Sequence, residues 1–119
     1  MTIADLTRTA GPAKDVPVTK EIQATLVALA DPGRRRAVEL LAERPMRTAE
    51  LAALAGTSRP ATGRYLRELT ERGLVETATV DRQGTVYRLR TDRFVALQSW
   101  LTELWAYWKG QLDEAGRAS

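Results

Sequence analysis

Apolar residues recur at helical spacing along most of the chain, and the first repeat predicts a helix that begins near residue 20. Ile22, Leu26 and Leu29 lie three or four positions apart, which predicts one buried face. Thr19 is a suitable N-cap for this helix. We expect the helix to end by Asp31, because the ring of Pro32 disfavours helical backbone at the residue before it.

A second helix follows directly, since Pro32 suits the first turn of a helix, where no backbone donor is lost. The pattern continues it to about Glu43, and Pro45 stops it. Its inward positions are Ala37, Val38, Leu40 and Leu41. Met46 and Arg47 then form a short extended link to the next helix.

Two helices joined by a glycine-containing turn come next. Thr48 is the expected N-cap of the first, which runs from Ala49 to Ala55 and is stopped by Gly56. Its expected buried residues are Leu51, Ala52 and Leu54. Ser58 caps the second helix, which continues to about Arg72. Its inward residues are Thr62, Leu66 and Leu69, Pro60 lies in its first turn, and Gly73 ends it.

From Leu74 the apolar pattern changes from helical spacing to alternation. Two β-rich runs, 75–79 and 86–90, flank a short turn at 81–84 that contains a glycine, which predicts a β-hairpin. Asp92 can then cap a long helix that reaches about Ala115. The apolar stripe of this helix consists of Phe94, Leu97, Trp100, Leu101, Leu104, Trp105, Trp108 and Leu112.

This order of elements, four helices, a hairpin and a long helix, predicts a mainly α, α+β fold: a winged helix-turn-helix. A length of 119 residues leaves room for one domain. We expect residues 1–18 to be a flexible N-terminal tail, because they lack periodicity and contain glycine and proline. Residues 19–115 are the expected domain, within which 93–115 form a terminal dimerisation helix.

The segment from Thr48 to Arg72 has the layout of a helix-turn-helix, whose second helix enters the major groove of DNA with its N-terminal end leading. The outward face of that helix is basic, and its N-terminus adds a partial positive charge. The hairpin that follows is typical of a wing. The predicted DNA-binding residues are Ser58, Arg59, Pro60, Thr62, Gly63, Arg64, Arg67 and Arg82.

Some of these charges have a plainer interpretation. Arg82 is equally well explained as a solvated residue of a hairpin turn. The basic run 34–36 starts a helix, which sends its three side chains in different directions. One of them can contact phosphate, but a solvated helix start explains the run as well.

The chain contains no cysteine and no histidine. This excludes disulfides, zinc fingers, iron–sulfur clusters, thiol nucleophiles and catalysis by Ser-His or Cys-His pairs. A carboxylate-only site for Mg²⁺ or Ca²⁺ requires a cluster of acidic residues, and the sequence shows none. We therefore expect no metal, no cofactor and no enzymatic activity.

The net charge is +3, and arginine supplies 15 of the 18 basic residues. Arginine suits phosphates and guanine edges better than lysine does, although a GC-rich genome produces the same bias. No apolar run approaches the roughly 20 residues that span a membrane, and charges interrupt any signal-peptide core. We therefore expect a cytoplasmic protein.

Four stretches of the chain, 28–36, 50–52, 58–69 and 72–75, resemble the ArsR/SmtB-type family of winged-helix repressors. The resemblance implies a homodimer that binds an inverted-repeat operator in double-stranded DNA and represses a nearby promoter. It also implies that the first and last helices form the dimer interface, and a cluster of aromatic residues on the last helix independently favours this. The predicted interface residues are Ile22, Leu26, Leu97, Trp100, Leu101, Leu104, Trp105 and Trp108.

The chain departs from the family at its metal sites. Metal-sensing members often carry a Cys-x-Cys pair in the helix before the recognition helix, where this chain has residues 50–54 without a thiol. Other members use histidine, aspartate and glutamate on the terminal helix, and this chain has no histidine. Metal and cysteine-based redox sensing are therefore not expected. Tyr65 stands where the family commonly has histidine, and it alters either a contact or the packing.

Other functions remain open at this stage. An apolar ligand can bind beside the tryptophan cluster and shift the dimer, because ligand pockets are commonly apolar and aromatic. A winged helix can also serve as a protein-interaction module, since fold does not dictate function. The arginines of the recognition helix favour DNA over that alternative. An enzyme is the weakest reading, because no nucleophile–base pair, carboxylate pair or phosphate-cradling loop is present.

Overall fold

The computed structural model describes residues 18–118, which contain five helices and three strands. The predicted tail, 1–18, lies outside the described residues except for Val18. Helices α3 (Lys20–Ala30) and α4 (Pro32–Leu41) come first. Thr19 caps α3 as predicted, since its Oγ1 accepts a hydrogen bond from the backbone N–H of Ile22 at 3.1 Å.

A single residue, Asp31, ends α3 and caps α4. Its carboxylate accepts a hydrogen bond from the backbone N–H of Arg34 at 2.9 Å, and this bond lowers the pKa of Asp31. Helix α4 therefore follows α3 with no loop between them. Helix α4 ends at Leu41, two residues before the predicted Glu43, because the last turn closes with a tighter bond from the N–H of Glu43 to the carbonyl of Leu40.

The helix-turn-helix consists of α5 (Thr48–Ala55) and α6 (Arg59–Glu71). The prediction that Thr48 caps α5 is wrong. Arg47 holds the N-cap position with extended backbone and no side-chain cap, because it still belongs to a strand when the helix begins. Gly56 ends α5 in the left-handed conformation (φ 67°) that glycine adopts without strain. Ser58 caps α6, as predicted, through the N–H of Ala61.

Three strands form an antiparallel sheet in the order β1-β3-β2: β1 (Met46–Arg47), β2 (Val75–Asp81) and β3 (Gly84–Leu89). The hairpin was predicted, but β1 was expected to be only a link. Met46 lies opposite Tyr87, and Arg47 opposite Val86, so the wing is joined to the N-cap residue of α5. A register shift between Thr77 and Thr79 places a bulge in β2. Such bulges increase the local twist of a hairpin.

The core lies between α4, α5, α6 and the base of the sheet, in line with the predicted inward faces. Its most deeply buried side chains are Met46, Leu51, Leu66, Leu69, Leu74 and Val75, each at most 1% exposed. Leu54 was expected to be buried but is 50% exposed. Helix α5 has only eight residues and buries one side through Leu51 and Ala52, so Leu54 faces outward.

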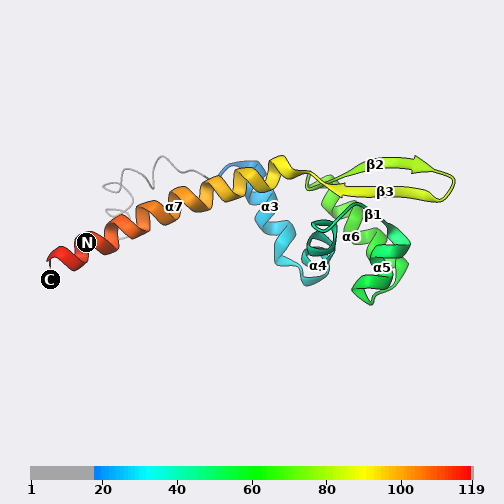
Figure 1. The fold of residues 1–119 in the computed structure, drawn as a ribbon, viewed down its shortest axis with the longest axis horizontal. Helices are drawn as coiled ribbons and strands as arrows, with labels where there is room; N and C mark the ends of the chain where they lie inside the picture. The colour runs from blue at the N-terminus through cyan, green and yellow to red at the C-terminus, as the bar shows by residue number, and fades with distance from the viewer. Residues whose placement is uncertain (1–17, 119) are drawn as a thin grey trace.

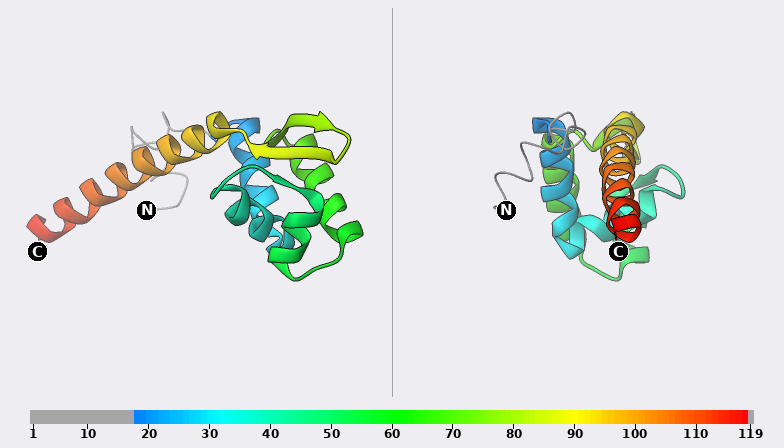
Figure 2. Two further views of the ribbon diagram at one scale, coloured as in Figure 1. Left: turned by 45° about the vertical axis from the view of Figure 1, so that its right-hand side comes forward. Right: turned by 90° about the vertical axis from the view of Figure 1, so that its left-hand side faces the viewer.

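Helix α7 (Thr91–Ala118) is longer at both ends than the predicted 93–115, and Asp92 lies in its first turn rather than at its cap. Its first residues contact α3, and Phe94 packs against the core. The rest of the helix extends away from the other elements, in the direction opposite to the wing (Figure 1, Figure 2). None of the helices in residues 18–118 is both long enough and apolar enough to cross a membrane.

Candidate nucleic-acid interface

Helix α6 has one face in the core and one in solvent. Thr62, Leu66 and Leu69 are buried, as predicted for the inward face. Thr62 was also predicted to bind DNA, a prediction that its burial in the single chain does not support. Its side chain is 2% exposed, and its hydroxyl donates a hydrogen bond to the carbonyl of Ser58 at 2.9 Å. Thr62 therefore holds the first turn of α6 in place from inside.

The solvent face of α6 gathers most of the other predicted DNA-binding residues. Its exposed members are Ser58, Arg59, Pro60, Arg64 and Arg67. Gly63 is partly buried and lies one turn from Arg59 and from Arg67, and a Cβ added there would meet no atom within 4 Å outside its own chain neighbours and helix backbone. A glycine inside a helix costs about 1 kcal/mol relative to alanine. Nothing within residues 18–118 requires a glycine here for packing.

Arg64 is held from two sides. Its guanidinium lies over the ring of Tyr65, 5.1 Å from the centroid, and its Nε is 3.8 Å from a carboxylate oxygen of Glu68. Tyr65 in turn packs on the backbone of Gly33 at the start of α4, where an added Cβ would overlap its ring. Of the two roles considered for Tyr65, the structure shows the packing role: Tyr65 joins α6 to α4 and supports Arg64.

The basic run 34–36 has a structural role that the sequence did not reveal. The guanidinium of Arg34 donates to the carbonyls of Ala28 and Val27 and forms an ion pair with Glu68 at 2.6 Å. It closes the C-terminus of α3 and ties it to α6. A basic side chain at a helix C-terminus satisfies carbonyls that have no partner within the helix. Arg35 bonds the carbonyl of Leu29 in the same way.

The tip of the wing is fixed to β1 by a two-pronged ion pair. Both terminal nitrogens of Arg47 donate to the carboxylate of Asp81 at 2.8 Å, and one of them also donates to the carbonyl of Gly84 at 3.1 Å. This pair lowers the pKa of Asp81, which also accepts from the N–H of Gln83. Arg82 is exposed in the turn between the strands. Arg47 was not among the predicted site residues, because its partner is 34 positions away.

The wing and the helix-turn-helix enclose a concave surface. A hollow of about 220 Å³ is lined by residues from the start of α5, the first residue of α6 and the wing tip: Arg47, Thr48, Ala49, Arg59, Gln83, Gly84 and Thr85. Arg47 is neutralised by Asp81. Arg59 is the other cation of this hollow, and it forms no ion pair with any described residue.

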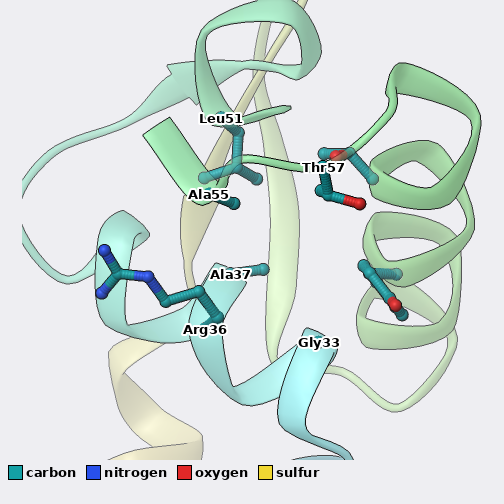
Figure 3. A pocket seen from close by; sticks show the side chains of 8 residues that line it. Gly33, Arg36, Ala37, Leu51, Ala55 and Thr57 are labelled. Atoms are coloured by element: carbon teal, nitrogen blue, oxygen red, sulfur yellow. The ribbon is translucent and has the colours of Figure 1, made fainter. Parts of the chain in front are cut away.

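A second, smaller cavity of about 90 Å³ lies between α4, α5 and α6. Figure 3 shows Leu51 and Ala55 of α5 on one side, Ala37 and Gly33 of α4 on the other, and Thr57 from the turn at its edge, with the guanidinium of Arg36 pointing away. Ligand pockets usually measure about 300–1,000 Å³. This space is suited to a few water molecules rather than to an effector.

The predicted dimer-interface residues fall into two groups. Ile22 is 6% exposed within the single chain, so it belongs to the chain's own core and offers little surface to a partner. Leu97 and Trp100 are half-buried. The others are open to solvent: Leu26, Leu101, Leu104, Trp105 and Trp108 are 39, 48, 38, 59 and 54% exposed.

We call residues 101–117 the distal part of α7. Its apolar stripe lines a hollow of about 380 Å³ formed by Leu101, Leu104, Trp105, Tyr107 and Trp108. The hollow has almost no polar lining, and Leu112 continues the stripe with 51% of its side chain exposed. Within residues 18–118, no three carboxylate, histidine or cysteine groups come together in a way that could hold a metal ion.

Comparison with known proteins identifies a family that shares this arrangement of elements. The family model described as bacterial regulatory protein, arsR family, matches residues 31–77, from the N-cap of α4 through the helix-turn-helix into β2. No curated protein matches the chain. An ArsR-like transcriptional regulator from Rhodococcus sp. RHA1 is 25% identical with a TM-score of 0.71, over 83% of this chain and 92% of that chain.

Two further solved structures cover nearly the whole fold. The transcriptional repressor BigR from Xylella fastidiosa is 27% identical with a TM-score of 0.58, over 86% of this chain and 92% of that one. A possible transcriptional regulator for arsenical resistance is 30% identical with a TM-score of 0.59, over 86% of this chain and 98% of that one. With the family model matching across the helix-turn-helix, these similarities show that the chain belongs to the ArsR/SmtB-type family of winged helix-turn-helix transcriptional regulators.

Proposed function

We propose that this protein represses transcription by binding an inverted-repeat operator in duplex DNA as a homodimer. The observation that supports this most directly is the solvent face of α6, where three arginines surround Gly63 beside the wing. A helix placed in the major groove with its N-terminal residues against the bases is the docking mode of helix-turn-helix proteins. Repression, rather than activation, is proposed by similarity to BigR, which is a transcriptional repressor.

The distribution of charge supports DNA as the partner. Several arginines of the body are neutralised by carboxylates, including Arg34, Arg47 and Arg88. Arg59, Arg67 and Arg82 form no ion pair among the described residues, and they lie on α6 and the wing tip. A net charge of +3 is modest, so this arrangement matters more than the total. Three exposed cations without an ion pair therefore lie on the elements that would contact DNA.

The dimer is proposed from the distal part of α7. Its stripe leaves the side chains of three leucines and two tryptophans between 38 and 59% exposed in a single chain. Monomeric proteins rarely expose a contiguous apolar surface of this kind, and tryptophan is enriched in the centre of interfaces. We propose that a second copy covers the stripe, with Leu26 of α3 at the edge, and that two α6 helices then face successive major grooves.

The protein would act by binding alone, without catalysis and without responding to a metal. The absence of cysteine and histidine from the sequence removes the usual ligands of soft metals. Contact with chromosomal DNA would place it in the cytoplasm. If an apolar effector exists, the hollow on α7 is where we expect it to bind, in competition with the second copy.

Selection of duplexes from a random pool tests the proposal. We expect the purified protein to enrich a palindrome with half-sites about one helical turn apart, roughly 34–36 Å. The affinity should fall steeply as salt rises, because each neutralised phosphate releases counterions. Failure to enrich any palindrome, or a complex that is insensitive to salt, would contradict the proposed function.

A further inference from the structure

Gly63 is the residue of α6 whose identity the protein's own packing does not explain. Three other glycines have internal reasons, whereas Gly110 and Gly116 of α7 share the open surroundings of Gly63. Gly33 makes room for the ring of Tyr65, while Gly56 and Gly73 adopt positive φ angles of 67 and 80°. Gly63 has ordinary helical backbone and open space where a side chain would be. An alanine there would strengthen the helix without meeting any neighbour.

The position of Gly63 on α6 suggests what the missing side chain leaves room for. Arg59 lies one turn before it and Arg67 one turn after it on the same solvent face. In the proposed complex this face meets the floor of the major groove, where base edges are read by side chains within hydrogen-bonding distance. A side chain between the two arginines would hold the helix away from the base pairs.

We infer that Gly63 is a specificity-determining residue, which lets the backbone of α6 come against the base-pair edges of duplex DNA so that Arg59 and Arg67 reach their partners. This inference rests on the proposed function. The role belongs to the absence of a side chain at Gly63, because the space left there determines how deeply α6 sits in the major groove. The required partner is duplex DNA with an accessible major groove.

The test compares two glycines that share the same internal surroundings. Gly110 lies inside α7, and an added Cβ there also meets nothing within 4 Å. It lies opposite the apolar stripe of α7, because 3.6 residues per turn place it about half a turn from Trp108. Gly110→Ala is therefore the matched control for Gly63→Ala, and Gly63→Leu extends the series to a larger side chain.

The experiment measures the affinity of each variant for the duplex that the wild-type protein selects, and the melting temperature of each without DNA. We expect both alanine variants to melt about 4–8 °C higher, since alanine is the better helix former. Gly63→Ala should bind about tenfold more weakly or worse, comparable to the loss of one good base contact. Gly63→Leu should bind more weakly still, and Gly110→Ala should bind like wild type.

The outcomes separate this inference from the proposed function. If wild type selects no duplex, the proposed function fails and the inference fails with it. If wild type selects a duplex and Gly63→Ala binds it with unchanged affinity, the inference alone is overturned. An equal loss for the Ala and Leu variants would also contradict it, because a gap that sets helix depth must respond to side-chain size.

Discussion

Apolar side chains are mostly buried in the body of the protein, residues 20–89, and mostly exposed on the distal part of α7. In the body, leucines such as Leu66 and Leu69 are at most 1% exposed, and the surface carries arginines and carboxylates. On the distal part of α7, which extends away from the body (Figure 1), Leu101 and Trp108 are about half exposed. The body buries its core within one chain, whereas the distal part of α7 has an apolar surface that one chain leaves uncovered.

The largest effect should come from truncating the core of the body. Leu69→Ala should lower the free energy of unfolding by about 2–5 kcal/mol, because the side chain is completely buried and its removal leaves a cavity. Leu54→Ala, at a leucine that is 50% exposed, is the matched control and should cost far less. Urea unfolding followed by circular dichroism measures both. Equal losses of unfolding free energy at the two sites would contradict the assignment of Leu69 to the core and Leu54 to the surface.

A charge on the stripe of α7 should break the dimer while sparing the body. Trp105→Glu should weaken dimerisation by about 2 kcal/mol or more, the size expected for a central aromatic residue of an interface. Ala106→Glu adds the same charge outside the stripe and should leave the dimer intact. Sedimentation over a range of concentrations distinguishes the two variants. A wild-type protein that sediments as a monomer at micromolar concentration would contradict the proposed interface.

An intermediate effect is expected at the DNA face, where binding changes but stability does not. Arg64→Ala should cost about 1–3 kcal/mol of binding to the selected duplex if Arg64 contacts a base, and should relax the preference at that base pair. Arg36→Ala is the control, because Arg36 is similarly exposed on α4 and pairs with Glu39. Equilibrium titration with matched and mismatched duplexes is the measurement. Identical losses on every sequence would reassign Arg64 to phosphate.

The smallest effect concerns the ion pair at the wing. Because Arg47 lowers the pKa of Asp81 in the folded protein, the pair stabilises the fold above the pKa of Asp81 in the unfolded chain, about 3.9. That contribution is lost as the pH falls through the lower folded pKa. The difference in urea midpoint between wild type and Asp81→Asn should therefore shrink between pH 6 and pH 2.5. A difference that stays constant over this range would show that the pair contributes through packing instead.

Sequence patterns predicted most of the fold because they report local physics. Proline, glycine and capping residues placed the helix boundaries within three residues, and Thr19 and Ser58 cap their helices as expected. Strand β1 was missed as a strand because two residues show no alternation, and its partner β3 lies about 40 positions away. Leu54 was misassigned because a helix of eight residues buries a narrower face than its composition suggests.

The candidate site was predictable in outline but not in detail. The basic face of α6 followed from helical spacing alone. Thr62 was assigned both to the core and to DNA, and the structure buries it in the core, 2% exposed, with its hydroxyl bonded to the carbonyl of Ser58. The partners of Arg34 and Arg47 lie on other elements, so no local pattern indicated that these two arginines serve the fold. In the proposed dimer, the residues that cover the stripe of α7 belong to the second copy, and this contact stays a prediction.

The junction between the wing and α7 has a mechanical consequence. A single residue, Arg90, separates the last residue of β3 from the first residue of α7, and its N–H is bonded to the carbonyl of Leu74 at 2.8 Å. Because this connection is one residue long and its backbone is hydrogen-bonded, the angle at which two α7 helices cross would fix the orientation of both wings. We expect the separation of the two wing tips, and hence the operator spacing that the protein tolerates, to be set at the far end of the molecule.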